Sequence, residues 1–135
     1  DNPFAEARDP IVLLPAIRPD VALFHARLGD RFGNVWVGNK RELFIMAHAA
    51  RATLATVEDV FDGDLVADER YAAGTIPALY VEAVAHVPNG AWPLALAGRY
   101  GCDAAVLRDY VGTARTDAGF ADWLARHVKH APVRA

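Results

Sequence analysis

The stretch that decides the fold is TVEDVFDGDLVAD, residues 56–68, read together with Thr53-Leu54-Ala55 immediately before it. The β-branched and apolar run 53–57 is typical of a buried strand. It leads directly into an acidic segment that carries Glu58, Asp59, Asp62, Asp64, Asp68 and Glu69. In open α/β sheets, ligands bind outside the carboxyl ends of the strands, so an acidic run at a strand exit is the first candidate for chemistry.

Patterns typical of strands and helices alternate on both sides of this stretch. The expected strands cover residues 11–14, 20–27, 35–37, 51–57 and 81–87, with a helix over residues 40–50. The near-continuous apolar run 20–27 predicts a strand covered on both faces. Asn39 is the expected N-cap of the helix, and Glu42 completes a capping-box pattern. Strand–helix–strand alternation predicts a layered α/β sheet.

The last third of the chain is expected to be helical. Asp103 is the expected N-cap of a helix over 104–113, and Thr116 or Asp117 is that of a second helix over 118–130. One buried face of the second helix is predicted by four residues at helical spacing, Phe120, Trp123, Leu124 and Val128.

Length and composition restrict the class of protein. The 135 residues predict one domain spanning 1–135, and 53% hydrophobic residues supply a core. A net charge of -3 gives no electrostatic footprint for nucleic acid. No apolar run reaches the about 18 residues that a membrane span needs, and the N-terminus lacks the layout of a secretory signal. The single cysteine, Cys102, fits a reducing compartment, so a cytoplasmic and, from the Ala- and Arg-rich composition, bacterial protein is expected.

Most general catalytic patterns are absent from the sequence. It contains no serine, no phosphate-binding glycine loop and no metal-binding spacing among its five histidines. His25 and His86 lie in expected strands and are interpreted as histidines satisfied by hydrogen bonds. Glu58 could act as a base, a hydrogen-bond acceptor or a partner contact, with a salt bridge to Arg51 or Arg70 as the alternative.

Three pieces of sequence carry a resemblance to a known family, in that family's order. They are Pro19-Asp20-Val21 with His25 and the Asp30-x-x-Gly33-Asn34 turn, then Val57-Glu58-Asp59, then the loop Pro88-Asn89-Gly90-Ala91-x-Pro93. On these motifs the chain, over about residues 2–130, resembles the C-terminal half of the A-type subunit of the family I coenzyme A transferases. The glutaconate CoA-transferase group is the most similar.

The resemblance implies a three-layer α/β/α fold with a mainly parallel sheet and C-terminal helices. It implies a heteromeric enzyme that moves CoA between carboxylic acids through a covalent glutamyl-CoA thioester. In this family the nucleophilic glutamate lies on the B-type subunit, followed closely by glycine. No glutamate of this chain is followed by glycine within two positions. We therefore assign no catalytic residue here, and expect Glu58 to order the strand exit.

The partners implied are the B-type subunit, the N-terminal half of the A-type subunit, an acyl-CoA and a carboxylic acid, without nucleic acid or membrane. Coenzyme A is implied as a substrate, and no covalently bound cofactor and no metal are expected. The implied border of the acyl or CoA site consists of Asp30, Gly33, Asn34, Glu58, Gly90 and Ala91.

Two other readings of the same residues stay open. The chain could belong to a ring-opening CoA-ester hydrolase, because a fold does not determine a reaction. It could also be a non-catalytic scaffold that binds a second subunit, with Trp36, Tyr80 and Trp92 as contacts. In each reading Gly33 and Gly90 are expected to meet a backbone requirement that only glycine satisfies.

Overall fold

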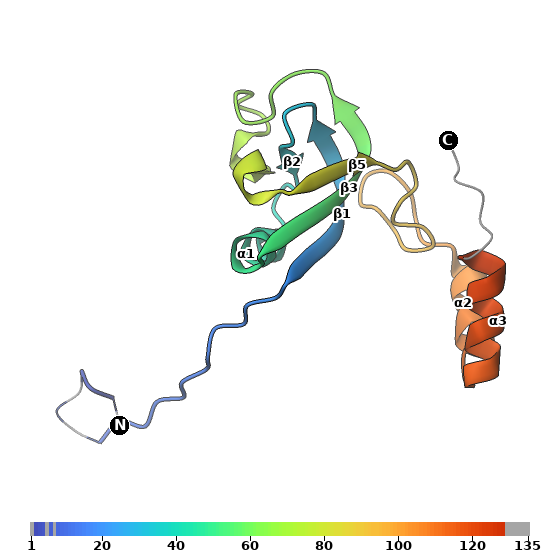
Figure 1. Ribbon diagram of the computed structural model, residues 1–135, viewed down its shortest axis with the longest axis horizontal. Coiled ribbons are helices and arrows are strands. Elements are labelled where there is room, and N and C mark those ends of the chain that lie inside the picture. Colours follow the sequence, from blue (N-terminus) through green and yellow to red (C-terminus); the bar gives the residue numbers. More distant parts are fainter. Residues whose placement is uncertain (1, 5, 7, 129–135) are drawn as a thin grey trace.

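The chain folds around one mixed sheet, seen in a computed structural model that describes residues 2–4, 6 and 8–128 (Figure 1). The strands are β1 (Val21–Asp30), β2 (Val35–Trp36), β3 (Ala52–Phe61), β4 (Thr75–Ile76) and β5 (Ala83–His86). Their order across the sheet is β4-β2-β1-β3-β5. The pairs β1–β3 and β3–β5 are parallel, and β2 joins β1 and β4 in antiparallel pairs. The predicted α/β class with a mainly parallel sheet is confirmed.

The parallel pair β1–β3 is the longest in the sheet. Its register runs from Val21 opposite Ala52 to Asp30 opposite Phe61. The predicted strand exit after Val57 is wrong, because β3 continues to Phe61 and Glu58 lies inside the strand. Val60 and Phe61 are good strand formers, and they continue the pairing with the end of β1. Glu58 and Asp59 of the acidic segment therefore lie within β3, whereas Asp62 and Asp64 lie in the loop that follows it.

One face of this sheet is packed under helix α1 (Arg41–Ala49) (Figure 1). The buried core consists of Ala26, Val35, Val37, Ala47, Ala55, Val57 and Ile76. On the other face, Leu23 of β1 is 66% exposed and its neighbour in the register, Leu54 of β3, is 37% exposed. The expectation that strand 20–27 is covered on both faces is therefore wrong at Leu23.

The helices begin where local capping chemistry places them, with one exception. Helix α2 (Ala104–Thr113) starts at the predicted cap, since the Asp103 carboxylate accepts the N–H groups of the second and third helical residues. Helix α3 (Asp117–His127) starts at Thr116, whose hydroxyl oxygen accepts the Gly119 N–H. The capping box at α1 is wrong, because Lys40 occupies the N-cap and makes no side-chain capping bond.

Helices α2 and α3 form a hairpin that stands to one side of the sheet (Figure 1). The rings of Tyr110 and Trp123 meet edge to face, with centroids 4.9 Å apart. No described residue of α3 is buried, so the predicted buried face is wrong, and Phe120 is 42% exposed. Residues 129 and 130 of the predicted second helix lie outside the described residues.

The described residues before β1 run as an exposed, irregular segment away from the sheet (Figure 1). The predicted strand 11–14 is wrong, because Pro10 and Pro15 flank it and no described strand lies beside it to pair with. None of the helices in the described part of the chain is long and apolar enough to cross a membrane.

The turn between β1 and β2 contains a position that favours glycine. Gly33 has a φ of +90°, a conformation that side-chain-bearing residues rarely adopt. We expect Gly33→Ala to lower the free energy of unfolding by about 1–2 kcal/mol. Gly112→Ala is the matched control, since an added Cβ there meets nothing within 4 Å. Because Gly112 lies inside a helix, that change should raise stability by about 1 kcal/mol.

Denaturant unfolding of both variants provides the measurement. An unchanged unfolding midpoint for Gly33→Ala would contradict a backbone requirement at this turn.

Candidate functional site

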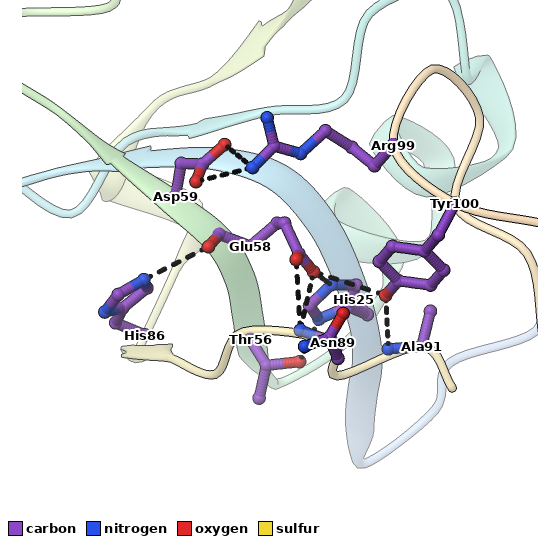
Figure 2. A network of polar contacts seen from close by, with 9 residues as sticks. All are labelled: His25, Thr56, Glu58, Asp59, His86, Asn89, Ala91, Arg99 and Tyr100. Carbon is purple, nitrogen blue, oxygen red and sulfur yellow. Dashed lines mark hydrogen bonds and ion pairs between the residues drawn. The ribbon is translucent and has the colours of Figure 1, made fainter. Parts of the chain in front are cut away.

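The Glu58 carboxylate lies at the centre of a buried polar cluster (Figure 2). Its side chain is 6% exposed. The Asn89 N–H donates to both carboxylate oxygens at 3.0 Å. The Tyr100 hydroxyl and His25 Nε2 each donate to Oε2 at 3.2 Å. Three donors from three separate segments therefore converge on one carboxylate.

Strand pairing places the first of these donors. His25 lies opposite Thr56 in the β1–β3 register, and Glu58 follows two residues later on the same face of β3. His25 Nδ1 lies 2.8 Å from the Thr56 hydroxyl oxygen. Since a carboxylate only accepts, Nε2 carries the hydrogen that it donates to Glu58, and in the neutral ring Nδ1 accepts from Thr56. His25 is thus satisfied by hydrogen bonds, as predicted.

The loop after β5 supplies the second donor, and hydrogen bonds from its backbone N–H groups hold it in place. Every N–H from residue 89 to 92 is used: Asn89 donates to Glu58, Gly90 to the Val87 carbonyl, Ala91 to the Tyr100 hydroxyl oxygen and Trp92 to the Asn89 carbonyl. None of these four groups is left to bind an oxyanion, so the loop acts through its shape.

Gly90 fits this loop for a steric reason. A Cβ at Gly90 would lie 2.7 Å from ring atoms of His25 and 2.8 Å from the Val87 carbonyl oxygen. The requirement for glycine here is therefore close approach to the Glu58 cluster, whereas at Gly33 it is the positive φ.

Burial and hydrogen bonding oppose each other at the Glu58 carboxylate. Burial raises its pKa, but the hydrogen bonds from the Asn89 N–H, His25 and Tyr100 outweigh burial, so the net pKa lies below the ordinary value of 4.5. Burial and the nearby Glu58 charge raise the pKa of the Tyr100 phenol. The cluster therefore holds an ionised carboxylate and a protonated phenol, which suits the observed donor pattern.

The salt bridges considered for Glu58 from the sequence are not the ones formed. Arg51 lies 4.0 Å from Asp20, and Arg70 pairs with Asp68 at 2.6 Å. The side chain that contacts the Glu58 carboxylate from a neighbouring strand is His25 instead, so the Arg51 or Arg70 alternative is wrong. The reason is that both arginines lie beyond the ends of the strand that carries Glu58.

Two further contacts secure the surroundings of the cluster (Figure 2). His86 Nε2 donates to the Glu58 backbone carbonyl at 3.1 Å, which satisfies His86 as predicted. The Arg99 guanidinium lies 2.8 Å from the Asp59 carboxylate and ties the loop before Tyr100 to β3. Strand β3 is therefore bonded through consecutive residues to β5 and to this loop.

A second buried cluster surrounds Asp30 at the end of β1. Asp30 Oδ1 accepts the Phe32 and Asn34 N–H groups at 2.9 Å, and Oδ2 accepts the Asn34 side-chain amide at 2.8 Å and the Leu65 N–H at 2.9 Å. Burial raises the pKa of Asp30, but these hydrogen bonds together lower it below its ordinary value. Asn34 Oδ1 in turn accepts the Ala78 N–H at 2.8 Å. The cluster joins the β1–β2 turn to two distant loops.

The structure divides the six predicted border residues between these clusters. Glu58, Gly90 and Ala91 belong to the first; Asp30, Gly33 and Asn34 belong to the second. In the described part of the chain, no three His, Cys, Asp or Glu side chains are grouped as a metal site requires.

Sequence reasoning missed Thr56 and Tyr100. Thr56 could have been found from its place two residues before Glu58, which puts both side chains on one strand face. Tyr100 gave no signal, since it lies in an irregular loop 42 residues from Glu58 along the chain.

The pH dependence of stability tests the role of Glu58. We expect Glu58→Gln to lower the free energy of unfolding by about 1–3 kcal/mol at pH 7, because buried donors lose a charged acceptor. Since the folded-state pKa lies below 4.5, the contribution of the charge is complete above that pH and is lost as pH falls through the folded pKa. The difference between wild type and variant should therefore shrink in acid.

Exposed Glu69, which makes no hydrogen bond or ion pair with a described residue, provides the control. Glu69→Gln should change stability by less than about 0.5 kcal/mol. Denaturant unfolding between pH 3 and 7 measures both variants, and equal effects of the two changes would contradict the role given to Glu58.

Comparison with known proteins places this chain in a family. Residues 8–86 match the family model described as coenzyme A transferase. The A-type subunit of the 3-oxoadipate CoA-transferase of Pseudomonas knackmussii is 32% identical over 88% of this chain and 42% of its own length. The cholesterol ring-cleaving hydrolase IpdA subunit of Mycobacterium tuberculosis is 32% identical over 82% of this chain and 39% of its own length.

The fold of this chain also matches a solved structure of a CoA-transferase. The crystal structure of glutaconate coenzyme A-transferase from Acidaminococcus fermentans superimposes with a TM-score of 0.84 and 30% identity, covering 95% of this chain and 40% of that chain. The chain thus spans less than half the length of these relatives. On the family model, the sequence identities and the shared fold, this chain belongs to the coenzyme A transferase family.

Proposed function

We propose that the chain is part of the A-type subunit of a CoA-transferase, where it helps to form the acyl-CoA site with a partner of the B type. Similarity to two proteins named as CoA-transferases supports the reaction class. The observation that carries the proposal is the state of Glu58: both carboxylate oxygens are occupied by donors. A carboxylate held in this way orders loops, and the attacking glutamate comes from the partner.

The reaction proposed for the assembled site follows carboxylate chemistry. A partner glutamate attacks the acyl-CoA carbonyl, and the C–S bond breaks to release the CoA thiolate and leave a mixed anhydride. The thiolate then attacks the glutamyl carbonyl, which forms the glutamyl-CoA thioester and releases the first acid. A second acid reverses these steps and leaves with CoA. Coenzyme A is thus a substrate of the site.

The part of this chain in the reaction is to shape the site. Its two buried clusters fix the turn over 30–34 and the loop over 88–93, each by hydrogen bonds to segments far away in the sequence. The border proposed for the acyl or CoA site is formed by Asp30, Gly33, Asn34, Glu58, Gly90 and Ala91. The cytoplasm is the proposed compartment, because Cys102 is an exposed free thiol and reducing compartments maintain such thiols.

Hydrolysis of a CoA ester is the second candidate, since a relative of equal identity is named as a ring-cleaving hydrolase. The two reactions differ in the acceptor: a transferase needs a second carboxylic acid, and a hydrolase needs water. A scaffold that only binds the B-type subunit would turn over neither substrate.

The experiment traps the intermediate in the complex that contains this chain and its co-purifying subunits. Borohydride reduces a glutamyl thioester to an alcohol, and peptide mass spectrometry then locates the marked residue. After incubation with acyl-CoA, we expect the mark on a glutamate of the partner subunit. We also expect Glu58→Gln to retain trapping per folded complex, because its effect is on stability.

A mark on Glu58 itself, or loss of trapping in a fully folded Glu58→Gln complex, would contradict this assignment. Release of CoA without any added acid acceptor would favour the hydrolase. Absence of any turnover in the intact complex would favour the third reading, in which the chain is a non-catalytic scaffold that binds the B-type subunit.

A further inference from the structure

The Tyr100 hydroxyl joins three segments of the chain at one oxygen atom (Figure 2). It donates to Glu58 Oε2 on β3 at 3.2 Å, and it accepts the Ala91 N–H from the loop over 88–93 at 3.1 Å. The backbone of Tyr100 closes a turn with Leu96 through two hydrogen bonds. A hydroxyl can make both side-chain bonds because it carries a donor as well as acceptor lone pairs. The strand, the loop and the turn therefore depend on one phenol.

The two N–H groups that hold the loop over 88–93 to the cluster have different acceptors. The Asn89 N–H donates to the Glu58 carboxylate, whereas the Ala91 N–H donates to the Tyr100 hydroxyl oxygen. Glu58 Oε2 already accepts from Asn89, His25 and Tyr100. Loss of the hydroxyl would therefore take one donor from Glu58 and leave the Ala91 N–H without its acceptor.

The turn over 96–100 has a second attachment to β3. The Arg99 guanidinium lies 2.8 Å from the Asp59 carboxylate, next along the strand to Glu58 (Figure 2). In a variant that lacks only the Tyr100 hydroxyl, this ion pair and the backbone bonds within the turn would keep the aromatic ring at the cluster. The contribution of the hydroxyl can thus be separated from that of the ring.

The same turn forms part of the wall of a cleft. The cleft has a volume of about 450 Å³, and residues 95–97 line it together with His25 and other residues of β1. This volume is in the range of small-molecule sites, which is about 300–1,000 Å³. Through Tyr100, the wall of the cleft and the loop over 88–93 are fixed relative to each other. A substrate that contacts both would meet a geometry that the hydroxyl sets.

We propose that Tyr100 is a positioning residue of the acyl-CoA site, which acts through the Ala91 N–H on the placement of the loop over 88–93. The inference rests on the proposed function, in which that loop borders the site. In this role the phenol touches none of the reacting atoms and fixes the loop before the substrate arrives. A displacement of about 1 Å can lower a rate roughly 100-fold, so one hydroxyl can matter more for turnover than for stability.

The first test needs no CoA chemistry. Amide hydrogen exchange is measured at single residues of the loop over 88–93 in the purified complex that contains this chain. We expect Tyr100→Phe to speed exchange at Ala91 about tenfold, as the loss of one hydrogen bond implies. Exchange at Asn89 should stay slow, because its N–H keeps Glu58 as an acceptor. Unchanged exchange at Ala91, or equal acceleration at both amides, would overturn the proposal.

The matched control is Tyr110→Phe, which removes the same hydroxyl group elsewhere. Tyr110 lies in α2, where its ring packs edge to face against Trp123 and takes no part in the Glu58 cluster. This variant should show wild-type exchange at Ala91 and wild-type turnover. Equal losses in the two tyrosine variants would overturn a specific role for Tyr100.

The second test asks whether the hydroxyl affects the reaction itself. Steady-state turnover of an acyl-CoA is measured per folded complex. We expect Tyr100→Phe to lower kcat about tenfold or more and to change the KM for the acyl-CoA by less than about threefold, because misplacement acts on the reacting geometry. A residue that only stabilised the fold would lower the yield of folded complex and leave kcat unchanged.

The outcomes separate this inference from the proposed function. Wild-type turnover with an unchanged kcat in Tyr100→Phe would overturn the positioning role and leave the transferase. A raised KM with an unchanged kcat would make the loop a binding element and would also overturn it. Absence of turnover in the wild-type complex, with the exchange effect confined to Ala91, would contradict the transferase and support the placement of the loop by Tyr100.

Discussion

The ionised carboxylate of Glu58 is the interaction on which the rest of the site depends. It lies within the central parallel strand pair and accepts hydrogen bonds from β1, from the loop after β5 and from the loop at Tyr100. A buried charge is costly unless it is fully hydrogen-bonded, and here the donors more than compensate for burial. The same bonds that stabilise the charge therefore hold together segments that are far apart in the sequence.

The consequence for function is a division of labour between the two subunits of the proposed enzyme. This chain supplies loops whose backbone N–H groups are occupied by internal hydrogen bonds. In the enzyme proposed above, these loops would shape the substrate site, while a glutamate of the partner subunit would perform the covalent step. The relatives include a subunit named for a transferase and one named for a hydrolase, and a shared fold does not determine the reaction.

Local patterns in the sequence predicted some local features of the structure but not the cap of α1, which lies at Lys40 and not at Asn39. The cap at Asp103 and the helix that follows were found because capping involves residues two and three positions apart. The segment 11–14 was mispredicted because a strand needs a neighbour, which no local pattern reveals. The groups that donate to the Glu58 carboxylate lie 31 to 42 residues away in the sequence, so the cluster became visible only through the strand register and the loop geometry.

Amide hydrogen exchange at Asn89 and Ala91 tests the central claim most directly. Both N–H groups lie in a loop but donate to the Glu58–Tyr100 pair. We predict that they exchange about as slowly as amides of the β1–β3 pair, and that Glu58→Gln speeds exchange at both while leaving the paired strands protected. Rapid exchange at Asn89 and Ala91 in the wild-type protein would contradict the claim that Glu58 holds this loop in place.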